Sequence, residues 1–311
     1  MALEVGSIVR HPKRPAWGPG KILSLEGDTA LVFFAEGGSH NELTKNPISL
    51  ELKTAGLESA GAVSHPRLDH LPPLVGDSLT EGDTYITLEQ GIDRFLRLFP
   101  EGFHGTSFDK EERGYKERAH HEAIRLLSRD ALNDLILRQD YDQVATRALQ
   151  VIQRVNLLFP QEQMAIRDGL KSAEDQRRFA LALFELLHGS ISYETRFPKF
   201  TEALSALPQK QAPVLKWPVQ TILPFLFDPT QHMFLKPQVT RQAARRCAFD
   251  LNYDPHPNWT TYSQLLELCR ILFRELARLK PRDYIDLQSF IWCIGDDNYE
   301  TLPKGDKPPS P

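Results

Sequence analysis

Short apolar runs separated by glycine turns fill the first 52 residues of the chain. The runs Val5–Val9, Lys21–Leu25 and Ala30–Phe34 favour strands, and the breaks between them are WGPG and EGD. Gly27 followed by Asp28 indicates a tight hairpin, because glycine readily adopts the positive φ that a short turn needs. A further short strand is expected near Asn41–Leu43. This pattern predicts a small β-barrel of the SH3 or Tudor type over residues 1–52.

From about residue 84 the apolar positions recur every three and four residues, as on one face of a helix. The cleanest stripe runs from Trp259 to Leu279; Asn258 or Thr260 can cap it, and Pro281 can stop it. The segment APVLKWPVQTILPFLFDP has three interior prolines, so we expect packed turns there rather than one helix. Other helical stripes cover residues 116–138, 141–158 and 174–187.

These patterns divide the chain into four parts. A glycine- and proline-containing linker without periodicity covers residues 53–83, between the barrel and the helical part. The helical domain covers residues 84–295, and a polar, proline-rich tail over residues 296–311 is expected to be disordered. The predicted fold class is therefore α+β, a small SH3/Tudor-like β-barrel followed by a larger, mainly α-helical domain.

Composition limits the classes of function. The 311 residues carry a net charge of -4, so the chain is not a uniformly basic nucleic-acid coat, and any phosphate contact must come from segregated patches. No apolar run approaches the roughly 18 residues of a membrane span, and the first residues do not resemble a signal peptide. Cys247, Cys269 and Cys293 form no C-x-x-C pair, which is typical of buried reduced thiols. We expect a cytoplasmic protein without a cofactor, a metal or a membrane partner.

The glycine and aromatic spacing of the first module resembles that of known bacterial modules. The matching residues are Gly6, Val9, His11, Trp17-Gly18-x-Gly20, Gly27-Asp28, Val32-x-Phe34 and Gly37-Gly38. This pattern is similar to the SH3/Tudor-like modules of CarD-type regulators and of the C-terminal tails of UvrD-type helicases. The resemblance implies work in bacterial transcription or DNA repair, through RNA polymerase or through DNA. No G-x-x-x-x-G-K-[ST] motif follows, so no helicase motor is predicted.

Basic residues gather in the first module. Within Val5–Leu25, which contains no Asp or Glu, lie Arg10, Lys13, Arg14 and Lys21, together with Trp17. Cations beside an exposed aromatic ring can hold a phosphate backbone and stack a base. Two other interpretations stay open: a protein contact, or a solvated loop in which Trp17 covers the barrel core.

A second basic patch lies in the helical domain. No acid occurs between Asp228 and Asp250, whereas Lys236, Arg241, Arg245 and Arg246 do. Arg241 and Arg245 would share one face of a short helix, and its N-terminus beside Lys236 could hold a phosphate. The alternative is an ordinary solvated helix face.

The signals for catalysis are weaker. Asp283 and Asp286 are spaced to share a metal ion on one helix face, as a nuclease would require. Alternatively Asp283 caps the last helix, with Ile285, Phe290 and Trp292 in the core. The adjacent His120 and His121 diverge by about 100° on a helix and are interpreted as a surface pair.

Together these observations predict a non-catalytic, nucleic-acid-associated accessory or regulatory protein of bacterial transcription, repair or defence. A role in defence is included because the segment KPRDYIDLQSFIW loosely resembles segments of restriction and defence proteins. The barrel would dock DNA, RNA or a protein such as RNA polymerase. The alternatives are a metal-dependent nuclease that uses Asp283 and Asp286, and a pure protein scaffold.

Overall fold

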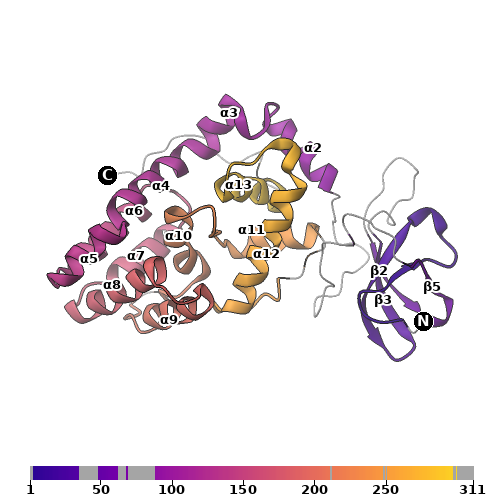
Figure 1. Cartoon of the computed structure of the whole chain (residues 1–311), viewed down its shortest axis with the longest axis horizontal. Coiled ribbons are helices and arrows are strands. Elements are labelled where there is room, and N and C mark those ends of the chain that lie inside the picture. Colours follow the sequence, from indigo (N-terminus) through magenta and orange to yellow (C-terminus); the bar gives the residue numbers. More distant parts are fainter. Residues whose placement is uncertain are drawn as a thin grey trace.

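A five-stranded antiparallel sheet at the N-terminus precedes a helical domain, which confirms the predicted α+β class (Figure 1). The predicted strand at Asn41–Leu43 and most of the predicted linker lie outside the described residues. The computed structural model describes residues 3–34, 48–61, 68, 88–210, 212–247, 249, 251–296 and 299.

The N-terminal sheet, here called the β module (residues 3–34 and 48–61), has the strand order β4-β3-β2-β1-β5 with antiparallel neighbours. Its elements are β1 (Ile8–Arg10), the 3₁₀ turn η1 (Pro15–Trp17), β2 (Pro19–Glu26), β3 (Thr29–Phe34), β4 (Ile48–Lys53), the 3₁₀ turn η2 (Thr54–Gly56) and β5 (Glu58–Ser59).

Alternate residues of β3 form the centre of the β module, because successive side chains of a strand point to opposite faces. Ala30, Val32 and Phe34 are fully buried and cluster with Val9 and Ile22. The predicted hairpin between β2 and β3 is present, and Gly27 adopts a φ of 60° in it.

The β module extends past the predicted boundary at residue 52. Glu58 and Ser59 of β5 pair with Arg10 and Val9 of β1, so the chain returns to the sheet after β4. A strand of two residues carries no alternation of apolar and polar positions, and the sequence pattern therefore does not reveal it.

The helical domain is built from short and medium helices joined by short loops. Its elements are α2 (Leu88–Leu98), η3 (Gly102–His104), α3 (Thr106–Phe108), the π-helical turn η4 (Asp109–Arg113), α4 (Gly114–Leu127), α5 (Arg129–Leu137), α6 (Tyr141–Ile152), α7 (Pro160–Gly169), α8 (Ala173–His188), α9 (Tyr193–Ser205), α10 (Trp217–Phe227), α11 (Pro237–Arg246), α12 (Trp259–Glu275), η5 (Ala277–Leu279) and α13 (Tyr284–Gly295).

Two predicted helical segments differ in the structure. The stripe over residues 116–138 is divided at Ser128, whose hydroxyl accepts a hydrogen bond from Ala131 N at 3.4 Å and caps α5. The proline-rich segment contains one continuous helix, α10, where packed turns were expected. Pro218 lies in its first turn, where no N–H is needed, and burial of almost the whole helix stabilises it despite Pro224 in its interior.

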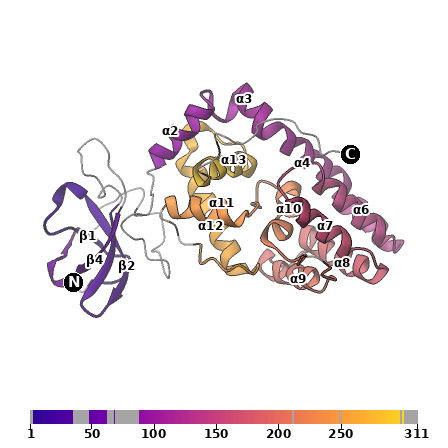
Figure 2. The same ribbon diagram turned by 180° about the vertical axis from the view of Figure 1, so that it is seen from behind.

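Helices α11, α12 and α13 lie together in the C-terminal part of the domain (Figures 1 and 2). Gly295 permits a close approach of α13 to α11, because a Cβ there would collide with the Val239 carbonyl and lie 3.1 Å from Ala243 Cβ. The three cysteines are buried free thiols, as predicted.

The helical domain also continues beyond the predicted start of the tail at Asp296. Tyr299 is 3% exposed and its hydroxyl donates to the Glu112 carboxylate, while Arg94 donates to the Asp296 carbonyl at 2.8 Å. Residues 300–311 lie outside the described residues.

Candidate nucleic-acid interface

The connection from β1 to β2 presents the predicted cations at one end of the β module. Arg10, Lys13 and Arg14 are all exposed, and no ion-pair partner contacts them among the described residues. Arg14 lies over the Trp17 ring at 5.2 Å from its centroid, a cation–π contact that orients the guanidinium without neutralising it.

Trp17 joins this loop to the core of the module. It is half-buried, packs beside the buried cluster, and meets the Phe34 ring edge-on at 5.6 Å between centroids. The covering role predicted for Trp17 as an alternative is therefore present. Part of the indole nevertheless stays exposed next to Arg14.

The His11 side chain lies in the same loop, close to its positive charges. Burial, followed by the charges of Arg14 and Lys13, lowers the pKa of the His11 imidazole. Its Nδ1 accepts a hydrogen bond from Lys13 N at 3.0 Å, which requires that this nitrogen carry no proton. The neutral imidazole thus holds the turn that exposes Lys13.

Two acidic residues, Glu26 and Asp28, lie at the other end of the module. Asp28 lies in the β2–β3 turn and pairs with Lys53 at 2.7 Å. The eight residues of β2 separate this turn from the cationic loop by roughly 25 Å. Other acids are closer: Glu51 lies opposite Leu31 in the middle of the sheet, and Glu58 lies directly opposite Arg10 across β1 and β5. Lys13 and Arg14 are therefore the strongest candidates for contact with an anion.

Lys21 differs from the other cations of the module. Its side chain is half-buried and its ammonium donates to the Leu68 carbonyl at 2.8 Å. This contact occupies the Lys21 ammonium within the protein, and we leave Lys21 out of the proposed surface.

Lys236 is also occupied within the protein. Its ammonium lies 3.6 Å from Glu162, 3.2 Å from the Leu157 carbonyl and 3.5 Å from the Phe159 ring centroid. Burial lowers the pKa of Lys236, while Glu162 opposes that shift. The phosphate position predicted at the N-terminus of α11 thus faces a carboxylate of the chain itself.

The three arginines of α11 point in different directions. Arg246 is 3% exposed and donates to the Ile294 carbonyl at 2.6 Å, so it joins α11 to α13 and has no exposed group to offer a phosphate. Arg245 is half-buried and Arg241 is exposed. Arg241 lies over the Tyr253 ring, 4.6 Å from its centroid.

The two aspartates of the nuclease alternative are bound by arginines. Arg113 donates to both oxygens of Asp283 at 2.8 Å and to Asp286 at 2.9 Å. Arg282 donates through its backbone N and its Nε to the second Asp286 oxygen, at 2.8 and 3.0 Å. Asp286 is fully buried, and a metal ion there would have to displace both arginines.

Asp283 caps α13, as the alternative interpretation predicted. Its carboxylate accepts a hydrogen bond from Ile285 N at 2.9 Å. Ile285 and Phe290 are buried, and Trp292 is half-buried. Among the described residues, no group of three or more His, Cys, Asp or Glu side chains is arranged to hold a metal ion.

A buried lysine completes this polar network. Lys116 is 1% exposed and donates to Glu112 at 2.8 Å and to Ser289 Oγ at 2.7 Å. Burial by itself lowers the pKa of Lys116, but Glu112 and Tyr115 together outweigh burial and raise it. A lysine whose pKa is raised is a poor base for Ser289. The network therefore joins α4 to α13 and is structural.

The sequence analysis did not select Arg113 or Lys116. A charged run, DKEERGYKE, contains both and has the composition of a solvated helix face. The π-helical turn η4 directs Glu112 and Arg113 inward instead, and the first turn of α4 does the same for Lys116. His120, another candidate on α4, is occupied within the protein, because its Nδ1 donates to the Leu226 carbonyl at 2.8 Å.

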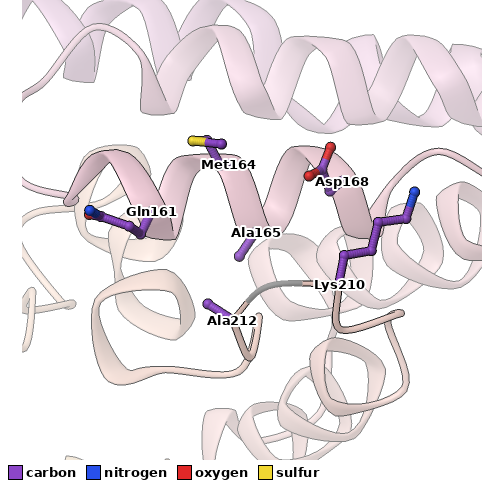
Figure 3. Close-up of a pocket in the computed structure, with 6 residues that line it drawn as sticks. All are labelled: Gln161, Met164, Ala165, Asp168, Lys210 and Ala212. Carbon is purple, nitrogen blue, oxygen red and sulfur yellow. The ribbon is translucent and has the colours of Figure 1, made fainter.

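A pocket of about 190 Å³ lies between α7 and the loop that follows α9 (Figure 3). Ala165 and Ala212 approach each other from its two sides, and the Asp168 and Lys210 side chains lie toward one end. Asp168 pairs with Lys171 at 2.6 Å. The pocket is smaller than most ligand sites and presents no nucleophile with a base, so it supports no catalytic role. Gln161 and Met164 complete its lining.

Within the part of the chain that the structure describes, no helix is long and apolar enough to cross a membrane.

Comparison with known proteins finds a similarity in the β module alone. No curated protein and no solved structure matches the chain. A family described as Protein of unknown function (DUF3553) matches residues 3–51, from the segment before β1 to the middle of β4. The β module is therefore similar to this family, and the match does not reach the helical domain.

Proposed function

We propose that this chain is a non-catalytic, nucleic-acid-associated accessory protein that uses the β1–β2 loop of its β module to bind a phosphate backbone. The observation that carries the proposal is the exposed pair Lys13 and Arg14, which no carboxylate of the described residues contacts. Burial lowers the pKa of His11, and the charges of Arg14 and Lys13 lower it further. Trp17 beside them offers a partly exposed ring for stacking.

The resemblance of the β module to SH3/Tudor-like modules of CarD-type regulators and UvrD-type helicase tails supports a role in bacterial transcription or repair. The resemblance is also compatible with docking on RNA polymerase. We favour nucleic acid because the loop concentrates positive charge at one end of the module, roughly 25 Å along β2 from Asp28.

The test is binding of the full chain to DNA and RNA, single-stranded and duplex, by fluorescence anisotropy between about 50 and 200 mM salt. We expect affinity to fall with rising salt. The double variant Lys13→Glu with Arg14→Glu removes two phosphate contacts and should lower the slope of log K against log salt for a duplex by about 1.8. The ratio of the Kd values at the two salt concentrations would shrink about tenfold.

The matched control reverses the same number of charges elsewhere. Arg138 and Arg270 are 64% and 65% exposed and already pair with Asp134 and Glu267 of their own helices. Arg138→Glu with Arg270→Glu should leave the salt slope close to that of the wild type. If the unmodified chain binds no nucleic acid at about 50 mM salt, or if the two double variants behave alike, the proposal is wrong.

A further inference from the structure

Among the described residues, Arg241 is held against an aromatic ring and contacts no carboxylate. Its guanidinium lies 4.6 Å from the centroid of the Tyr253 ring, and the side chain is exposed. Arg113, Arg178 and Arg282 of the same domain contact carboxylates instead. Stacking on a ring restricts the guanidinium plane while leaving its positive charge available to an external anion.

The turn that carries Tyr253 is fixed on both sides. Thr261 Oγ1 donates to the Asn252 carbonyl at 2.7 Å and accepts from Asp254 N at 3.1 Å. Trp217 Nε1 donates to the Asp254 carbonyl at 2.8 Å, which attaches the turn to α10. Tyr253 is therefore a rigid support, and Arg241 loses little further freedom when it binds a ligand.

The one carboxylate in this turn is directed to a different partner. Asp254 Oδ1 accepts a hydrogen bond from His256 N at 2.7 Å and lies 3.2 Å from His256 Nδ1. Helix α11 itself, PQVTRQAARR, contains no Asp or Glu. The charge of Arg241 is consequently not balanced by an acid on its own helix.

Helical spacing places other polar side chains beside Arg241. Gln238 and Arg245 lie three and four positions away and are not buried, whereas Thr240, Ala243 and Ala244 face the core. Lys216, half-buried at the N-cap of α10, directly precedes the Trp217 that holds the turn. The exposed side of α11 thus presents the stacked guanidinium of Arg241 next to the exposed Gln238.

We propose that the exposed face of α11, centred on Arg241 stacked on Tyr253, is a second nucleic-acid contact that binds the phosphodiester backbone and not the bases. This inference rests on the proposed function. The guanidinium already covers a face of Tyr253, so the N–H groups on its edge are what remains for a ligand. That edge matches two phosphate oxygens, and a phosphate contact carries no sequence information.

The test compares Arg241→Glu with Arg270→Glu, both exposed arginines of neighbouring helices with the same change in net charge. Using duplex DNA of two unrelated sequences, we expect Arg241→Glu to lower the salt slope by about 0.9 and Arg270→Glu to leave it unchanged. The loss should be equal on both sequences. Tyr253→Leu keeps the charge, so the slope should stay while affinity falls about twofold to fivefold.

The outcomes separate this inference from the proposed function. If the salt slope falls in Lys13→Glu with Arg14→Glu but is normal in Arg241→Glu, the α11 contact is wrong and the β1–β2 loop contact stands. If the salt slope is normal in the loop variant but falls in Arg241→Glu, the loop contact is wrong and the α11 contact stands. If Arg241→Glu affects one sequence much more than the other, backbone contact is wrong. If the unmodified chain binds no nucleic acid, single-stranded or duplex, both proposals fail.

Discussion

Replacing Arg113 with methionine should destabilise the helical domain, because it leaves the buried Asp286 and the partly buried Asp283 without their shared cation. Arg113 is 5% exposed and lies 2.8 Å from Asp283 and 2.9 Å from Asp286. Breaking a buried ion pair by removing one partner costs about 3–5 kcal/mol. Asp286 retains Arg282 and Asp283 retains Ile285 N, so we expect a loss near the lower limit, about 3 kcal/mol.

Urea denaturation followed by circular dichroism at the helix band measures this loss. For a domain of this size, about 3 kcal/mol corresponds to a fall in Tm of roughly 6–12 °C. Arg138→Met is the control, because Arg138 is 64% exposed and pairs with Asp134 on the surface. Its unfolding free energy should change by less than about 0.5 kcal/mol.

A double-mutant cycle identifies the interaction itself. Asp283→Asn keeps an acceptor for the cap of α13 but removes the charge that Arg113 binds. The loss in the double variant should be smaller than the sum of the single losses. An Arg113→Met protein within about 1 kcal/mol of the wild type would refute the reasoning. Asp283 and Asp286 would then be available again as candidates for a metal site.

Three further predictions concern the same domain. Burial lowers the pKa of His232 from 6.5 to about 4, so the folded protein should lose stability as the pH falls from about 6.5 to 4. His232→Phe should reduce this loss by up to about 3 kcal/mol, measured by urea titration at each pH. Parallel pH profiles of the variant and the wild type would contradict this prediction. Tyr299→Phe removes the hydroxyl that donates to Glu112 and should cost about 1.5–3 kcal/mol, measured in the same way, whereas no change would mean that this contact is absent. Gly295→Ala should lower Tm by several degrees, because its Cβ would meet the Val239 carbonyl; an unchanged Tm would show that α11 and α13 are farther apart.

The β module illustrates how far local pattern extends. Gly27-Asp28 and the alternation Ala30, Val32, Phe34 predicted the β2–β3 hairpin and its buried face, because strand geometry and glycine turns act within a few residues. Strand β5 was missed, since a two-residue strand is defined by its partner β1 and not by its own residues.

The cations around α11 show what the local sequence pattern could not predict. Sequence grouped Lys236, Arg241 and Arg246 by the absence of acids nearby along the chain. Glu162 and the Ile294 carbonyl, from distant segments, occupy Lys236 and Arg246, whereas Arg241 meets Tyr253. Charge density along a chain does not show which cations a fold pairs internally, because ion pairs form between residues far apart in sequence.

By itself the sequence determined the α+β class and the cationic loop of the β module, and it offered the capping of α13 by Asp283 as one of two alternatives; these follow from spacing within a few residues. Only the tertiary structure decided that Asp283 and Asp286 are bound by Arg113, and that Lys116 is buried beside Glu112 and Tyr299. The physical reason is that a buried charge is stabilised by the partners that packing supplies, and packing joins α4 to α13 across more than half of the chain.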